Sequence, residues 1–270
     1  YYVNDSSTSF DSWTTAPGND ANPGTNAAAP KRTVTNLLAS IALTPGDVIY
    51  IDSGFYSNYT VTVTNGGTVA NPVRFLGSTN LTAGGTIFVR NNLSANVWSL
   101  NAAPNVVLRD LTMRSGQEGV NLISSSGVRL EQLMLVANSR YGVWINSDSH
   151  NVVLNNVVLS QNGDYGVYVN SSTNCSVDHS VLWGNRGLWS RNGGNSTYIS
   201  NSVIRASGIG NFAFRRESDI FSDFNLFVLE DSAAMATQDG VTLYAIPRLS
   251  DWQRAYSNDW QSTTLNPLFA

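Results

Sequence analysis

Asp178 and His179 are adjacent, and they form the pair in this sequence best suited to acid–base chemistry. A carboxylate that holds an imidazole ring can orient it as a general base. Glu131 and Asp178 offer a second arrangement, because a separation of about 9.6 Å would lie near the upper limit for an inverting glycosidase. Cys175 is the only cysteine, so the chain has neither an internal disulfide nor a cysteine-based metal site.

A lyase that acts on uronates needs positive charge beside the carboxylate and a base for the proton. The only lysine, Lys31, lies in an expected cap helix, which leaves arginine or tyrosine as the base. Calcium sites use clustered acids on adjacent turns. The acids here are scattered, at Asp110, Glu131, Asp148 and Asp164. We therefore predict no metal site and no cofactor, and Ca²⁺ is the alternative that the sequence does not indicate.

The composition excludes several classes of partner. Only 13% of the 270 residues are charged and the net charge is −4, so no basic stripe is present for nucleic acid. No apolar run approaches the roughly 20 residues of a membrane span. Sparse charge, a single lysine and abundant Asn, Ser, Thr and Gly favour a secreted, extracellular or cell-surface location.

An internal repeat dominates the middle of the chain. Strand-like segments begin at Gly119, Gly142, Gly166 and Gly187, at spacings of 23, 24 and 21 residues. Each is followed by two more short segments in which apolar residues alternate with polar ones, as in half-buried strands. These lie at residues 128–130, 152–154, 175–177 and 197–199, and then at 133–135, 157–159, 180–182 and 202–204. An asparagine precedes each return to glycine, at Asn138, Asn162 and Asn185.

Three short strands in about 22 residues cannot bury their apolar faces alone. Stacked repeats would bury a continuous core and pair each strand with its copies above and below. The sequence therefore predicts an all-β parallel β-helix of about seven or eight turns, a single domain over residues 1–270. Its turns would occupy residues 47–218.

The two ends differ from the repeat. Residues 31–43 carry apolar side chains at helical spacing, so residues 1–46 are expected to be an N-terminal segment with a cap helix. Residues 219–270 lose the repeat and become aromatic-rich, which predicts an irregular C-terminal cap. Caps of this kind cover the exposed edges of a solenoid.

Several segments resemble the ends of secreted bacterial right-handed parallel β-helix proteins of the pectate-lyase-like superfold. They are residues 1–5, 16–21 and 45–56 at the start, and 223–227 and 266–269 at the close. The resemblance implies a right-handed helix but no single activity, because that superfold includes pectate and alginate lyases, polygalacturonases, epimerases, phage tailspikes and surface modules without known catalysis. The aspartate pattern of polygalacturonases does not occur here.

The glycine-led strands place an aromatic residue outward on three successive turns, at Trp144, Tyr168 and Trp189. Asn121 would precede this exposed ladder and Phe212 would continue it. Beside it we expect glycan-binding polar groups at Asn146, Asn170 and Arg191. Rings flanked by amides and guanidinium suit a sugar chain. The simpler alternative is that the rings only stabilise neighbouring strands.

Charged residues of alternating sign, Arg140, Asp164 and Arg186, come just before the glycines. Arg140 and Arg186 are candidates for binding an acidic sugar, and the alternative is a salt-bridge ladder of little energetic weight. His179 occupies the same repeat position as Asp110, Gln132, Asn156 and Asn201, where left-handed turns favour asparagine. We therefore interpret His179 as a turn residue.

The favoured function is a non-catalytic extracellular structural or adhesive module that contacts polysaccharide through Trp144, Tyr168 and Trp189. One alternative is a polysaccharide lyase or glycoside hydrolase for an acidic glycan, with Arg140, Arg186 and Tyr165 on the binding face. Another is a subunit of an extracellular filament or sheath, in which neighbouring copies meet end to end or through edge strands.

Overall fold

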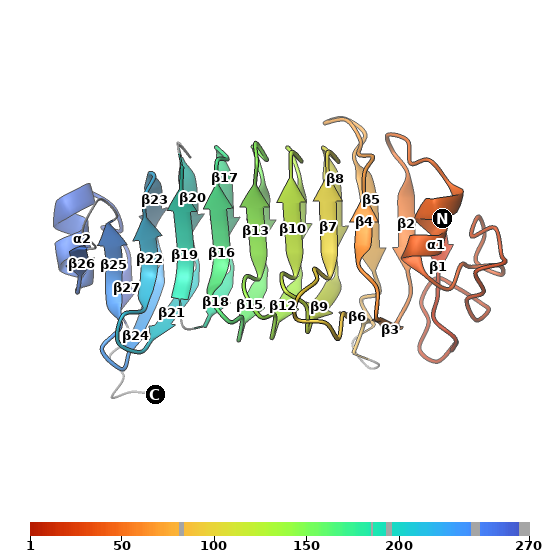
Figure 1. The fold of residues 1–270 in the computed structure, drawn as a ribbon, viewed down its shortest axis with the longest axis horizontal. Helices are drawn as coiled ribbons and strands as arrows, with labels where there is room; N and C mark the ends of the chain where they lie inside the picture. Colours follow the sequence, from red (N-terminus) through yellow and green to blue (C-terminus); the bar gives the residue numbers. More distant parts are fainter. Residues whose placement is uncertain (81–83, 185, 193–195, 239–243, 265–270) are drawn as a thin grey trace.

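Three parallel β-sheets wind along one long axis in the computed structural model (Figure 1), which describes residues 1–80, 84–184, 186–192, 196–238 and 244–264. Within these residues each sheet has nine strands, and the chain makes about eight turns. The predicted right-handed parallel β-helix is therefore confirmed.

Each turn contributes one strand to each sheet, in the order sheet A, sheet B, sheet C over most of its length. Sheet A contains β1 (Tyr2–Val3), β2 (Val48–Ile51), β5 (Val73–Gly77), β8 (Val106–Arg109), β11 (Arg129–Glu131), β14 (Val153–Asn155), β17 (Cys175–Asp178), β20 (Thr197–Ser200) and β23 (Ile220–Asp223). Sheet B contains β3 (Gly54–Ser57), β6 (Thr86–Val89), β9 (Leu111–Arg114), β12 (Met134–Val136), β15 (Val158–Ser160), β18 (Val181–Trp183), β21 (Val203–Ser207), β24 (Leu226–Glu230) and β27 (Thr263–Thr264). Sheet C contains β4 (Val61–Val63), β7 (Trp98–Asn101), β10 (Val120–Ile123), β13 (Val143–Asn146), β16 (Tyr165–Asn170), β19 (Arg186–Arg191), β22 (Phe212–Arg216), β25 (Ala234–Gln238) and β26 (Tyr244–Ile246).

The repeat sets the register of the strands. Val143 pairs with Val167 and Val167 with Leu188, so equivalent inward residues of sheet C stack directly on one another. All three are fully buried. Each such side chain stabilises the fold by about 1.5–3 kcal/mol relative to exposure to water. The glycine before each of them also faces inward, since a Cβ on Gly142 would lie 2.4 Å from Leu159 Cδ2.

At the corner between sheets A and B, one residue of each successive turn has the left-handed backbone conformation. These residues have φ values of 47–56°: Asp110, Gln132, Asn156, His179, Asn201 and Phe224. Asn and Asp tolerate this conformation better than other residues with a side chain. The prediction that His179 is a turn residue is confirmed, and Phe224 is the member least suited to the position.

A buried asparagine ladder lies at the corner between sheets B and C. Asn162 Oδ1 accepts hydrogen bonds from Asn138 N and Asn138 Nδ2, at 3.2 and 3.1 Å, and Asn162 Nδ2 donates to Leu135 O. The ladder satisfies backbone groups that have no strand partner at the bend. Asn185, expected as the next member, lies outside the described residues.

The N-terminal cap contains the expected helix, α1 (Val34–Ser40). Thr33 caps it by accepting a hydrogen bond from Asn36 N, and Val34 and Leu37 are fully buried against the first turns. Lys31 precedes the helix instead of lying in it. The segment before α1 contributes β1 to sheet A, where β1 pairs with β2 in parallel.

The parallel stacking continues beyond residue 218. Strands β23, β24 and β25 pair in register with the preceding turn, so the expected boundary at residue 219 was one turn too early. Aromatic residues hid the repeat, because Phe224 and Phe227 stand where the preceding turn has Asn201 and Ile204.

The C-terminal cap begins after β25. There β26 pairs antiparallel with β25, and helix α2 (Leu249–Tyr256) buries Trp252 completely, with its ring centroid 5.5 Å from that of Phe214. In Figure 1 the helix lies at the end of the stack opposite α1. Residues 266–269 lie outside the described residues.

Candidate functional site: an aromatic and arginine face

The outer side of sheet C carries the predicted aromatic ladder. Trp144 pairs in register with Tyr168, and Tyr168 with Trp189. The ring centroids are 6.0 and 4.3 Å apart, with interplanar angles of 20° and 25°. Asn121 precedes the ladder as expected, but Phe212 does not continue it. Arg215 takes the next position instead, in register with Trp189.

The ladder is less exposed than predicted. Tyr168 is only 5% exposed, and Trp144 and Trp189 are half-buried. The tyrosines that precede two of the glycines, Tyr141 and Tyr165, cover it: their ring centroids lie 4.9 Å from Tyr168 and 5.4 Å from Trp189, respectively. The two rows therefore form one packed aromatic cluster with indole rings at its surface.

Four arginines place their guanidinium groups over these rings. Arg140 lies 4.7 Å from the centroid of the Tyr141 ring and 5.3 Å from that of Trp144. Arg186 lies over Tyr165, and both Arg191 and Arg215 lie over Trp189, at 5.4, 5.5 and 4.1 Å, respectively. Cation–π contacts of this kind fix arginine side chains beside aromatic surface. We call this set of rings and arginines the aromatic–arginine face.

Ion pairs hold the arginines in place. Arg186 forms an ion pair with Asp164 at 2.5 Å. We expected these two residues to be in register, but the strand partner of Arg186 is Tyr165. Glu217 accepts from Arg191 Nε at 3.0 Å, Arg215 Nη2 at 2.9 Å and Trp189 Nε1 at 2.9 Å. Among the described residues, these four arginines form ion pairs with three acids, Asp164, Glu217 and Glu118. Arginines therefore outnumber their acidic partners on the described part of this face, although the whole chain has a net charge of −4.

Glu118 is the residue that sequence reasoning missed. It is fully buried, and neither carboxylate oxygen has a hydrogen-bond partner among the described residues. Burial raises the pKa of Glu118 to about 7, against the opposing effect of Arg140, whose Nη1 lies 3.4 Å from Oε1. Glu118 directly precedes Gly119, and Tyr141 and Tyr165 hold the same place in the next two repeats. This shared position was the signal in the sequence that Glu118 would lie beside the aromatic residues.

Replacing Glu118 with glutamine should flatten the pH dependence of stability. The raised pKa means that the folded state binds more protons than the unfolded state between about pH 4.5 and 7. Stability from this group is therefore fully present below that window and is lost as the pH rises through 7. We expect Glu118→Gln to gain about 1–3 kcal/mol relative to the parent at pH 8 and little at pH 4.5. Urea unfolding at the two pH values measures this, and equal changes at both would contradict it.

A row of amides borders the aromatic–arginine face, as predicted. Asn170 Nδ2 donates to Asn146 Oδ1 at 2.9 Å, and Asn192 Nδ2 donates to Asn170 Oδ1 at 2.8 Å. Asn170 is in register with Arg191 on the next strand. The sequence-predicted residues Arg140, Trp144, Asn146, Tyr168, Asn170, Arg186, Trp189 and Arg191 therefore lie on or beside one side of the helix.

The Asp178–His179 pair lies on sheet A, away from this face. The two side chains are hydrogen-bonded at 2.7 Å, and Asp178 also accepts from Ser200 and Asn201. Partial burial acts to raise the pKa of Asp178, but the hydrogen bonds outweigh it and the pKa is lowered. Because the Ser200 hydroxyl donates to the carboxylate, it is not arranged as a nucleophile activated by the ring. Glu131 shares the register of Asp178 two turns away, and Arg129 binds it at 2.6 Å.

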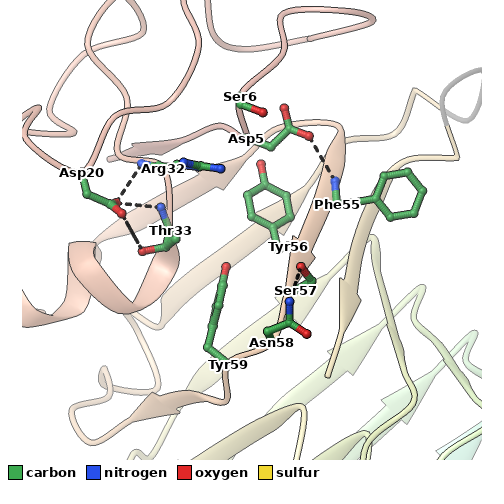
Figure 2. A pocket seen from close by; sticks show the side chains of 10 residues that line it. All are labelled: Asp5, Ser6, Asp20, Arg32, Thr33, Phe55, Tyr56, Ser57, Asn58 and Tyr59. Carbon is green, nitrogen blue, oxygen red and sulfur yellow. Dashed lines mark hydrogen bonds between the residues drawn. The ribbon is translucent and has the colours of Figure 1, made fainter. Parts of the chain in front are cut away.

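A hollow of about 500 Å³ lies beside the N-terminal cap (Figure 2). Figure 2 shows the Arg32 side chain reaching between Asp5 and Asp20. Asp20 accepts hydrogen bonds from the backbone of Arg32 and Thr33, and Asp5 accepts from Phe55 N. These bonds join the N-terminal segment to α1 and β3, so we assign the hollow a structural role.

Comparison with known structures finds the same fold in several lyases. The chain is similar to the pectate lyase Pel9A, with 13% identity and a TM-score of 0.65 over 87% of this chain and 70% of that one. It is also similar to a rhamnogalacturonan lyase, with 15% identity and a TM-score of 0.58 over 90% and 77%, respectively. For an alginate lyase from Paenibacillus sp. strain FPU-7 the identity is 18% and the TM-score 0.54, over 72% and 73%.

The sequence itself identifies the family. Residues 45–244 match the model of the family described as periplasmic copper-binding protein (NosD), and the chain belongs to that family. No curated protein matches the sequence. Among the described residues, no helix has the length and apolar character needed to cross a membrane.

The residues that favour copper do not converge in the described parts of the chain. No group of three or more His, Cys, Asp or Glu residues could hold a metal there. His150 Nδ1 accepts a hydrogen bond from Thr173 N, and His179 lies at a different corner. The Cys175 thiol is buried, donates to Ser149 O, and has its pKa raised to about 11 by desolvation. These residues therefore do not fit a multi-ligand copper site.

Proposed function

We propose that this protein acts outside the cytoplasm and binds an acidic polysaccharide along the aromatic–arginine face. The observation that carries the proposal is the excess of arginine over acid on this face, combined with indole rings at its surface. The exposed parts of the two indoles offer apolar contact to the C–H groups of sugars, and guanidinium groups match carboxylates with two parallel hydrogen bonds.

The length of the face suits a polymer. From Asn121 on β10 to Arg215 on β22 the register runs across five neighbouring strands. At about 4.8 Å per strand, this span is roughly 19 Å. A chain lying across the strands would meet Trp144, Trp189 and Arg215, with the buried Tyr168 between the two indoles. The lyase structures that share this fold support a polysaccharide as the ligand, and the word periplasmic in the family description supports the location outside the cytoplasm.

Removing the surface rings should weaken binding under conditions in which the variant is still folded. We expect Trp144→Ala combined with Trp189→Ala to reduce affinity for polygalacturonate or alginate about 10- to 100-fold, because the apolar contact of both indoles with the sugar is lost. Arg140→Ala should reduce affinity for the acidic polymers alone. Affinity electrophoresis with dextran as the neutral comparison measures both effects.

Arg109 provides the matched control. It lies on sheet A, its side chain is 47% exposed, and its ion pair with Asp110 resembles those of the face. Arg109→Ala should retain full affinity. If Arg109→Ala weakened binding as much as Arg140→Ala, net charge and not this face would explain the affinity.

A lyase or hydrolase for the same glycan is the second candidate function, and Glu118 favours it. A carboxyl group with a pKa of about 7 is suited to proton transfer at neutral pH. Arg140 bridges this carboxyl and Tyr141, whose hydroxyl accepts from Arg140 Nη2 at 3.2 Å. Against catalysis, the Glu118 side chain is only 1% exposed. Unsaturated-uronate absorbance or new reducing ends, lost in Glu118→Gln while binding remained, would establish this function.

A further inference from the structure

Phe224 occupies a backbone conformation that its residue type disfavours. Its φ is 56°, at the corner where the earlier turns have Asp110, Gln132, Asn156, His179 and Asn201. A bulky residue in the left-handed region is an outlier that calls for an explanation. The side chain is also 57% exposed, so core packing does not supply one.

Two more aromatic residues lie beside it. Tyr198 and Phe221 are in register on β20 and β23, with ring centroids 5.4 Å apart and an interplanar angle of 22°. They are 43% and 44% exposed. Together with Phe224 they line a hollow of about 460 Å³, and we call these three residues the C-terminal aromatic platform.

Polar groups surround the platform, and none of the described residues that line the hollow is cationic. The polar lining residues are Ser200, Asn201, Ser222, Asp223, Ser257, Asn258 and Asp259. Asp223 Oδ1 accepts from Phe224 N and Gln261 N, at 2.9 and 2.8 Å, which fixes its carboxylate at the edge of the hollow. The neighbouring turn adds the carboxylate of Asp178, which Asn201 binds. This charge disfavours an anionic ligand.

We propose that the C-terminal aromatic platform is a second carbohydrate site and that it binds a neutral sugar. Flat rings with fixed carboxylate and amide groups at their edge match the C–H faces and hydroxyls of an uncharged pyranose. The charge of this hollow is opposite to that of the aromatic–arginine face. The two sites therefore select sugars of different charge, and they lie on different sheets.

Phe224→Asn is the decisive variant, because asparagine is the residue that the corner prefers. We expect it to keep or raise Tm and to weaken binding of neutral oligosaccharides at least tenfold. Titration by NMR or calorimetry should use cellohexaose, mannohexaose and galactan oligosaccharides, with polygalacturonate in a separate arm. Met134→Ala is the control, since Met134 is 45% exposed on sheet B and lies outside the hollow.

The outcomes separate this proposal from the first one. Loss of neutral-sugar binding in Phe224→Asn with intact polygalacturonate binding supports the platform, whether or not the aromatic–arginine face binds its own ligand. Absence of binding to every neutral oligosaccharide at millimolar concentration would overturn it. So would sedimentation showing a dimer that Phe224→Asn dissociates, because a second copy would then be the occupant.

Discussion

Replacing Asp52 with alanine is expected to release the N-terminal segment and to lower the free energy of unfolding by about 3–5 kcal/mol, because several hydrogen bonds to a charged group are lost together. The carboxylate is fully buried at the end of β2. It accepts hydrogen bonds from the backbone N of Ser12, Trp13 and Thr14, at 2.7, 2.8 and 2.8 Å, and also from Thr14 Oγ1 and Ser53 N. Alanine would leave these donors buried without an acceptor, and such groups are costly.

Urea unfolding and limited proteolysis measure the two parts of this result. Cleavage within residues 6–16 should accelerate in Asp52→Ala, while the turns from β5 onward stay resistant. Asp52→Asn keeps one acceptor oxygen and should fall between the parent and Asp52→Ala. Asp148→Asn, the same change at an exposed corner, is the control. Equal stability of Asp52→Ala and the parent would mean that other contacts hold the segment.

Asn162→Ala is expected to lower the free energy of unfolding by about 2–4 kcal/mol, through the broken ladder and the small cavity it leaves. Its amide accepts two hydrogen bonds from Asn138 and donates one to Leu135 O at 3.0 Å, all of them buried. Removal therefore leaves polar groups of two adjacent turns unsatisfied.

Equilibrium unfolding in urea measures this loss. Asn155→Ala is the matched control, because Asn155 lies on the outer side of β14 and is exposed. We expect that variant to stay within about 0.5 kcal/mol of the parent. If both variants lost the same stability, the ladder would contribute no more than an exposed asparagine.

The repeat made most of the fold predictable. Inward valines and leucines with period two, glycines 21–24 residues apart and left-handed Asn or Asp at one corner leave few alternatives to stacked parallel turns. Equivalent positions are neighbours in such a stack, so the contacts of Trp144, Tyr168 and Trp189 followed from alignment of the repeats alone. The assignment of His179 to a turn followed in the same way.

The predictions that were wrong or missing concern contacts between residues at different repeat positions, or residues that break the repeat. Tyr168 is buried between Trp144 and Trp189 and against Tyr141, whose side-chain direction strand alternation does not specify. The environment of Glu118 depends on Arg140 from the next turn. Aromatic substitutions after residue 218 obscured the final turn, so neither its strands nor the platform around Phe224 could be recognised from the pattern.

The strict register of the strands has a consequence for how such a surface can change. Each turn pairs only with the turns before and after it, so duplication of one whole turn would preserve every contact type in the stack. A copy of the turn that carries Trp144 would add two more rings, equivalent to Tyr141 and Trp144, and one more arginine to the face. Binding to a polymer could therefore be strengthened by avidity, one subsite at a time, with no change to the chemistry of any single contact.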